Sequence, residues 1–137
     1  MSGELVGALI VPGLPQPLLC PEANEGWQRV HDAYKAARAL IDELKPDRLV
    51  LYSTQWHSII GHQLLTDPNP KWALVDEEFH ALGTMHYSLN IDADLGEETV
   101  KAAQARGLTA RGVNYYGFPV DTGSVVALSL LDPEGTL

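Results

Sequence analysis

The sequence predicts one α/β domain spanning residues 1–137, with a mostly parallel sheet and helices flanking it. Three observations support this class. Short apolar runs at 5–11 and 48–52 have the nearly continuous hydrophobicity of strands that are buried on both faces. A strongly periodic helical segment separates these runs, so together they predict a β-α-β unit. A chain of 137 residues also has room for one hydrophobic core rather than two.

The clearest predicted helix spans residues 26–44. Its apolar side chains recur at spacings of three and four residues and therefore share one face: Trp27, Val30, Tyr34, Ala37, Ile41 and Leu44. Asn24 is placed to cap the first turn, and Pro46 ends the helix because the residue before a proline disfavours helical backbone.

The rest of the chain continues the alternation of strands and helices. Strands are expected at 59–65, 87–91 and 108–113 and helices at 94–106 and 123–131, while 71–85 shows no clear pattern. Asp121 or Thr122 is a candidate cap for the last helix, which is apolar almost all round and should be buried on several sides. A further strand would come next in this pattern, so the sequence predicts an apparently truncated sheet.

Composition narrows the classes of partner. The chain has 9 basic and 18 acidic residues, a net charge of −9, which disfavours binding to nucleic acid and to anionic lipid. No apolar stretch approaches the roughly 20 residues of a membrane span, and the N-terminus does not resemble a signal peptide. We therefore expect no nucleic-acid partner, no membrane partner and a cytoplasmic location.

Several motifs match metal-binding or catalytic patterns, and each also has a structural explanation. His57 and His62 are five residues apart, a spacing that places them on different faces of a strand, so we predict no metal ligands and no catalytic residue. A metal site that His80 and His86 form with Glu77 and Glu78 through a loop stays open. Asp121-Thr122-Gly123 matches the aspartic-protease motif, but helix capping explains it better within an α/β pattern.

An aromatic run suggests a pocket. Tyr115, Tyr116 and Phe118 follow the strand predicted at 108–113, and they either line a pocket for an aromatic ligand or pack on their own core. The carboxyl ends of strands in open α/β sheets are where sites form. The candidate pocket residues are accordingly Trp56, His57, Asn114, Tyr115, Tyr116, Phe118 and Asp121.

Three runs carry a resemblance to a known family. They are Val11-Pro12-Gly13, Val50–Trp56 (VLYSTQW) and Arg111–Gly123 (RGVNYYGFPVDTG). With these runs the whole chain resembles the N-terminal half of class III extradiol ring-cleaving dioxygenase subunits. In the iron-binding subunits of that family, a histidine follows the proline after the first strand and another precedes the tryptophan after the second. A glutamate and a catalytic histidine come from the C-terminal half.

The resemblance implies a degenerate metal site in this chain. The two histidine positions correspond to Gly13, which has no donor atom, and Gln55, whose neutral amide is a poor iron ligand. The implied role is a non-catalytic structural subunit with no cofactor of its own. Fe(II) would lie in the partner subunit. The expected partner is a catalytic dioxygenase subunit or the missing C-terminal half, and a homo-oligomer is possible. The alternatives are an active Fe(II)-dependent dioxygenase component and a small aromatic-ligand binding module.

Overall fold

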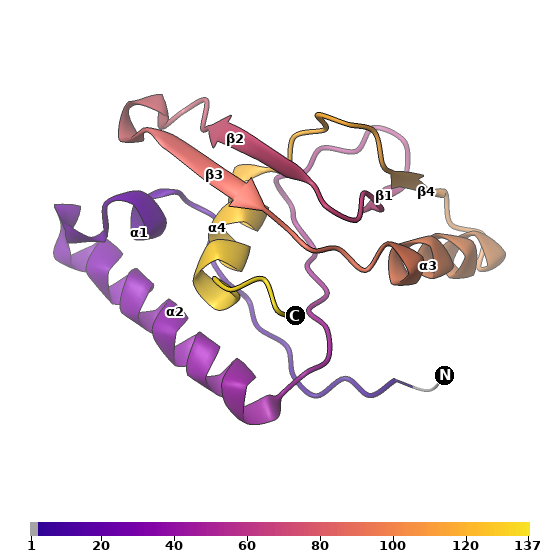
Figure 1. Cartoon of the computed structure of the whole chain (residues 1–137), viewed down its shortest axis with the longest axis horizontal. Helices are drawn as coiled ribbons and strands as arrows, with labels where there is room; N and C mark the ends of the chain where they lie inside the picture. The colour runs from indigo at the N-terminus through magenta and orange to yellow at the C-terminus, as the bar shows by residue number, and fades with distance from the viewer. Residues whose placement is uncertain (1–2) are drawn as a thin grey trace.

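The computed structural model describes residues 3–137 and places helices around two short sheets (Figure 1). In chain order the elements are α1 (Gln16–Leu19), α2 (Glu25–Leu44), β1 (His62–Leu65), β2 (Lys71–Val75), β3 (Thr84–Ser88), α3 (Ala93–Ala105), β4 (Ala110–Val113) and α4 (Thr122–Leu131), with 3₁₀ turns at Pro21–Ala23 and His80–Leu82. Strand β1 pairs with β4 in parallel, and β2 pairs with β3 in antiparallel fashion. The α/β class, with parallel strand pairing and flanking helices, is confirmed.

Two predicted strands are wrong. Residues 5–11 and 48–52 are irregular in the structure, so the expected β-α-β unit is not formed. Leu5 and Val50 are 86% and 87% exposed. The physical reason is that a strand needs a neighbouring backbone to pair its N–H and C=O groups, and within residues 3–137 neither segment has one. An apolar composition shows that a segment tends to be buried, but it does not determine which strand pairs with that segment.

Helix α2 matches its prediction closely. Asn24 accepts a hydrogen bond from the Trp27 amide at 3.0 Å, which satisfies one of the free N–H groups at the helix start. At the other end Lys45 adopts left-handed backbone, with φ of 49°. None of the helices in the described residues is both long and apolar enough to cross a membrane.

The parallel pair lies at one end of the molecule. Its register aligns His62 with Ala110, and helix α3 packs against both strands. Asp92 caps α3 through the Leu95 amide at 3.0 Å, and Gly107 follows the helix with φ of +78°. The predicted strands 59–65 and 108–113 and the helix 94–106 are therefore present, with shifted or shorter bounds.

The antiparallel pair lies largely where the sequence shows no clear pattern. Strand β2 lies inside the unpatterned stretch 71–85, and the strand predicted at 87–91 begins earlier, at Thr84. Residues Met85 and Tyr87 on β3 are buried, whereas their neighbours along the strand are exposed. The strand therefore has one face on the core and one face toward solvent.

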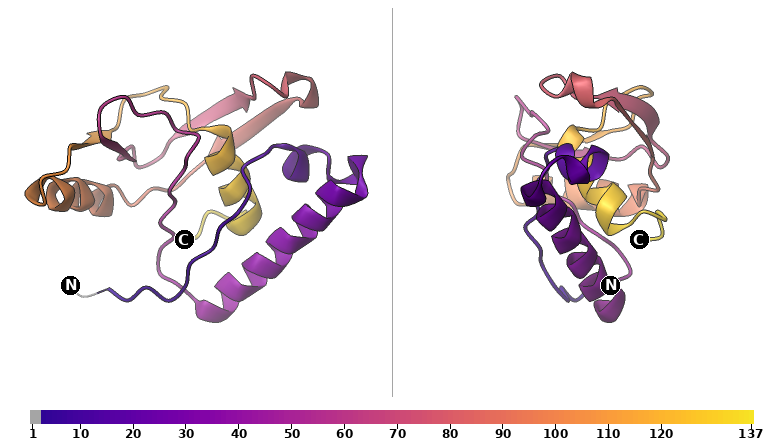
Figure 2. Two further views of the ribbon diagram at one scale, coloured as in Figure 1. Left: turned by 180° about the vertical axis from the view of Figure 1, so that it is seen from behind. Right: turned by 90° about the vertical axis from the view of Figure 1, so that its left-hand side faces the viewer.

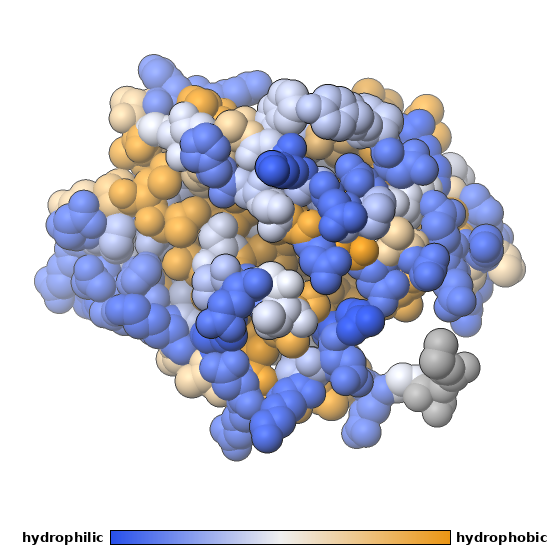
Figure 3. All heavy atoms as spheres, in the orientation of Figure 1, coloured by the Kyte–Doolittle hydropathy of each residue, from blue (hydrophilic) through white to orange (hydrophobic). Residues whose placement is uncertain are grey.

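Helix α4 is the centre of the core. It lies between α2 and the β2–β3 pair (Figure 2). Val125 and Val126 are completely buried and cluster with Met85, Tyr87 and Val120. Hydrophilic side chains follow the outer edge of α2, and apolar atoms are visible between α2 and β3 (Figure 3). Burial of α4 on several sides agrees with its apolar composition.

Tyr34 ties α2 to the loop after residues 5–11. Its hydroxyl donates a hydrogen bond to the Pro12 carbonyl, and burial raises the pKa of Tyr34 to about 12. A raised folded-state pKa contributes stability below the ordinary value of 10.0 and loses it as the pH rises toward the folded-state value.

We expect Tyr34→Phe to lower the free energy of unfolding by about 1 kcal/mol at neutral pH, the net contribution of one hydrogen bond. The variant should also lose less stability than the wild type between neutral and strongly alkaline pH. Urea denaturation at several pH values measures both effects. Tyr52→Phe, at an 82% exposed tyrosine, is the control and should change neither; equal effects in the two variants would contradict the role of Tyr34.

Candidate functional site

The Gln55 side chain joins three segments that are far apart in the sequence. Its Nε2 donates to the Gly13 carbonyl at 3.2 Å, and its Oε1 accepts from the Gly123 amide at 2.7 Å. Gly123 is in the first turn of α4, where backbone N–H groups have no partner within the helix. Gln55 therefore caps α4 from a distant loop while it holds the loop at Gly13.

Asp121 completes the capping of α4. Its Oδ1 accepts hydrogen bonds from the Ser124 amide at 3.0 Å and from Ser53 Oγ at 2.8 Å. Its Oδ2 accepts from the Ser124 hydroxyl at 2.7 Å. The prediction that Asp121 serves as a helix cap is confirmed. The carboxylate accepts three hydrogen bonds from two segments, so it acts as a structural acceptor in this arrangement.

Gly13 and Gly123 touch so closely that neither position has room for a side chain. A Cβ atom at Gly13 would lie 2.6 Å from Gly123 Cα and 3.0 Å from Gln55 Nε2. A Cβ atom at Gly123 would lie 2.9 Å from Gln55 Oε1. Backbone atoms at such a distance cannot move aside as a flexible side chain can, so the packing here depends on both glycines.

A second carboxylate fixes the start of α4 from the β2 side. Thr122 Oγ1 donates to Asp76 Oδ2 at 2.5 Å, and Asp76 Oδ1 accepts from the amides of Glu78 and Phe79 at 3.0 and 2.9 Å. The Thr122 hydrogen bond, followed by these backbone bonds, lowers the pKa of Asp76 below its ordinary value of 3.8.

The aromatic residues form two groups. Phe118 packs against Trp56 and Tyr115, with ring centroids 5.3 and 5.1 Å apart. Tyr116 instead meets Trp72 of β2 edge-on at 5.8 Å. The indole N–H of Trp56 is buried without a hydrogen-bond partner among the described residues. Much of the predicted aromatic pocket is therefore filled by its own rings.

The structure does not bring all the predicted pocket residues together. Gly13, Gln55 and Asp121 meet at the start of α4. His57 and Asn114 are exposed and take part in no hydrogen bond within the described part of the chain. The residues that sequence reasoning missed as site members are Ser53, Trp72, Asp76 and Gly123. Ser53 and Gly123 lie inside recognisable runs, but nothing in the unpatterned stretch around Asp76 signals its contact with Thr122.

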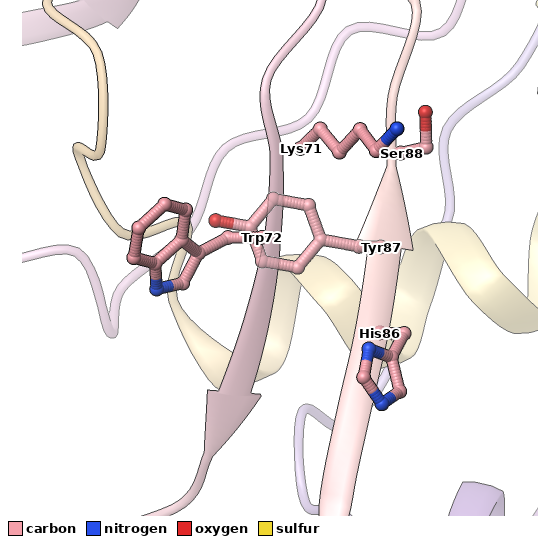
Figure 4. A pocket seen from close by; sticks show the side chains of 5 residues that line it. All are labelled: Lys71, Trp72, His86, Tyr87 and Ser88. Carbon is pink, nitrogen blue, oxygen red and sulfur yellow. The ribbon is translucent and has the colours of Figure 1, made fainter.

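Two hollows lie beside the aromatic loop. The larger, about 440 Å³, is an open depression over β2 and β3 lined by Lys71, Trp72, His86, Tyr87 and Ser88 (Figure 4). The smaller, about 50 Å³, lies between Trp72, Tyr116 and Phe118. Among residues 3–137, no three His, Cys, Asp or Glu side chains gather in a way that could hold a metal ion.

We expect Gly13→Ala to destabilise the protein by about 1–3 kcal/mol, because the added methyl group meets backbone atoms that are already in contact. Chemical denaturation measures this change. Gly3→Ala is the matched control, since a Cβ atom there meets nothing within 4 Å. A Gly13→Ala variant as stable as the Gly3→Ala variant would show that the close approach is not a constraint.

We expect Asp76→Asn to lower stability at neutral pH by about 1 kcal/mol through the weakened hydrogen bond to Thr122. Because the folded-state pKa of Asp76 is lowered, its stabilisation is present above 3.8 and is lost as the pH falls through the folded-state value. The variant should therefore lose less stability on acidification than the wild type. Thermal unfolding from neutral to acidic pH tests this; parallel curves would refute it.

Comparison with known proteins supplies the family. The model of the catalytic LigB subunit of aromatic ring-opening dioxygenase matches residues 11–136. The alpha subunit of 2-aminophenol 1,6-dioxygenase from Pseudomonas sp. is 35% identical over 127 residues, which cover 93% of this chain and 46% of the relative. The beta subunit of the same enzyme is 30% identical over 140 residues, with 97% and 46% covered.

The chain thus spans about half the length of the curated relatives it matches. The match takes in the loops that carry Gly13 and Gln55 and the whole of α4. On this evidence the chain belongs to the LigB family of aromatic ring-opening dioxygenases.

Proposed function

We propose that this chain is a non-catalytic structural subunit of a class III extradiol-type ring-cleaving dioxygenase, similar in role to the alpha subunit of 2-aminophenol 1,6-dioxygenase. The observation that carries the proposal is the engagement of Gln55. Both ends of its amide are used in hydrogen bonds to Gly13 and Gly123, at 3.2 and 2.7 Å. We assign Gly13 and Gln55 to the positions where the resemblance implies histidine ligands in catalytic subunits.

The residues at these positions do not fit Fe(II), the metal on which catalytic subunits of the family depend. Gly13 offers no side-chain donor and has no room for one. The Gln55 oxygen already accepts the Gly123 amide, so its use by a metal would leave a helix N–H unpaired. The nearby carboxylate, Asp121, is occupied by three hydrogen-bond donors. The local chemistry favours a structural use of this site.

A companion subunit follows from the same proposal. The two curated relatives are named as alpha and beta subunits of one enzyme. We propose that this chain supports a catalytic dioxygenase polypeptide in the same way and that the ring-cleaving iron lies there. The candidate pocket residues Trp56, Tyr115 and Phe118 would then have a packing role at the loop that carries Gln55.

Two other functions fit the described residues less well. An active Fe(II) enzyme would need ligands that the described residues do not gather, as the donor set above indicates. An aromatic-ligand binding module would need a cavity of about 150 Å³ to hold a benzene ring. The hollow between the aromatic side chains is about 50 Å³, and the larger one is an open depression on the sheet.

The test combines metal content with oxygen uptake. We expect the chain, reconstituted with Fe(II) without oxygen and then desalted, to retain substoichiometric iron and to consume no oxygen with catechol or 2-aminophenol. Gln55→His should behave in the same way, because one added imidazole still lacks a second ligand at Gly13. The two-subunit Pseudomonas enzyme is the positive control. Stoichiometric iron together with ring-cleavage product from the chain alone would end the proposal.

A further inference from the structure

The smaller hollow, beside strand β2, has four aromatic rings in its walls. Trp72 and Tyr87 are directly opposite each other in the β2–β3 register, so their side chains share one face of the sheet. Tyr116 meets Trp72 edge-on, with ring centroids 5.8 Å apart and an angle of 84° between the ring planes. Together with Phe118 these rings line a space of about 50 Å³.

A carboxylate lines the same hollow. Asp67 lies in the turn between β1 and β2. Its Oδ1 accepts a hydrogen bond from the Asn69 amide at 3.2 Å, which fixes the side chain against the turn. Its Oδ2 takes part in no hydrogen bond or ion pair among residues 3–137. The hollow therefore combines aromatic rings with a carboxylate oxygen that is available as an acceptor.

The charges around the hollow favour a cation over an anion. Lys71, the basic residue of the lining, precedes Trp72 along β2, and consecutive side chains of a strand point to opposite faces. Figure 4 shows the Lys71 side chain extending toward Ser88. The net charge of −9 also attracts cations to the molecule as a whole. Aromatic rings are the groups with which proteins recognise ammonium ligands, because the ring face carries partial negative charge.

The volume of the hollow limits the size of the cation. Its 50 Å³ exceeds the roughly 10–15 Å³ that a single water molecule needs. It is well below the volume of about 150 Å³ in which an engineered cavity holds benzene. A primary ammonium group with one or two carbon atoms lies between these limits, whereas an aromatic amine is too large.

We propose that the hollow between Asp67, Trp72 and Tyr116 binds a small primary ammonium ion such as methylammonium. The –NH₃⁺ group donates a hydrogen bond to the Asp67 carboxylate, and the two rings stabilise its positive charge. The site goes beyond the proposed function and does not rest on it, because these three residues take no part in the hydrogen bonds of Gln55.

The tryptophan indole groups provide the readout for a ¹H–¹⁵N NMR titration. Methylammonium chloride should shift the indole N–H signal of Trp72 along a saturating curve in the millimolar range, since a ligand of so few atoms makes few contacts. The indole signal of Trp27, which lies in α2, should not move.

Two controls separate specific binding from other effects. Sodium chloride at equal ionic strength supplies a cation without N–H donors, and methanol supplies a neutral molecule of similar size. Neither should give a saturating shift at Trp72. An equal shift with sodium would mean a general counter-ion effect, and the absence of saturation with methylammonium would mean that the hollow holds only water. Either result would overturn the proposal.

Matched variants locate the site. Asp67→Asn keeps an oxygen for the Asn69 amide but removes the charge, so methylammonium should bind about tenfold more weakly. Tyr116→Leu removes a ring at an 87% exposed position, where folding does not depend on it, and should weaken binding about threefold. Asp94→Asn makes the same change of charge at an exposed position in α3 and should leave the affinity unchanged. Wild-type affinity in Asp67→Asn, or an equal loss in Asp94→Asn, would refute the assignment.

A larger ammonium ion tests the size limit. Tetramethylammonium has the same charge as methylammonium, but it is bulkier and has no N–H group to donate to Asp67. We expect it to bind about tenfold more weakly than methylammonium in the same titration. Tighter binding of tetramethylammonium would mean that the cation lies on the exposed ring surface rather than in the hollow, and the proposal would be wrong.

Discussion

The structure depends on satisfying the backbone amides at the start of α4. The first N–H groups of a helix have no partner within the helix, and here the side chains of other residues accept them. Gln55 takes the Gly123 amide and Asp121 takes the Ser124 amide. The loop that holds Gln55 is thereby fixed against the core, and Gly13 is drawn into contact with Gly123.

This constraint accounts for the chemistry of the site. Both ends of the Gln55 amide have partners within the protein, so a metal would have to compete with bonds that hold the core helix. Side-chain volume adds a second barrier, because Gly13 cannot gain a ligand without separating two backbones. A fold of this family can therefore carry, where these segments converge, a site that is held together by hydrogen bonds between them.

Local signals in the sequence were sufficient for most helices. Asn24 and Asp121 cap helices as their residue types and positions predict, and the periodic apolar face of α2 is present over nearly its whole expected length. Strand pairing is harder to predict than a helix, because hydrophobicity shows that a segment tends to be buried but not which strand lies beside it. For that reason residues 5–11 and 48–52 have the sequence pattern of strands but pair with no other strand in the described structure. The contact of Asp76 with Thr122 joins residues 46 positions apart and leaves no local pattern.

The Gln55 site joins two irregular segments to the central helix. Residues 4–11 lead into Gly13 and residues 48–52 lead into Gln55, with only a few residues between. Gln55 holds the ends of both segments together, because its amide bonds to Gly13 and to Gly123. The second of these bonds caps α4, which packs against α2 and β3. Loss of the Gln55 amide would therefore release both loops from the start of α4, while the buried valines of that helix would still hold it in the core.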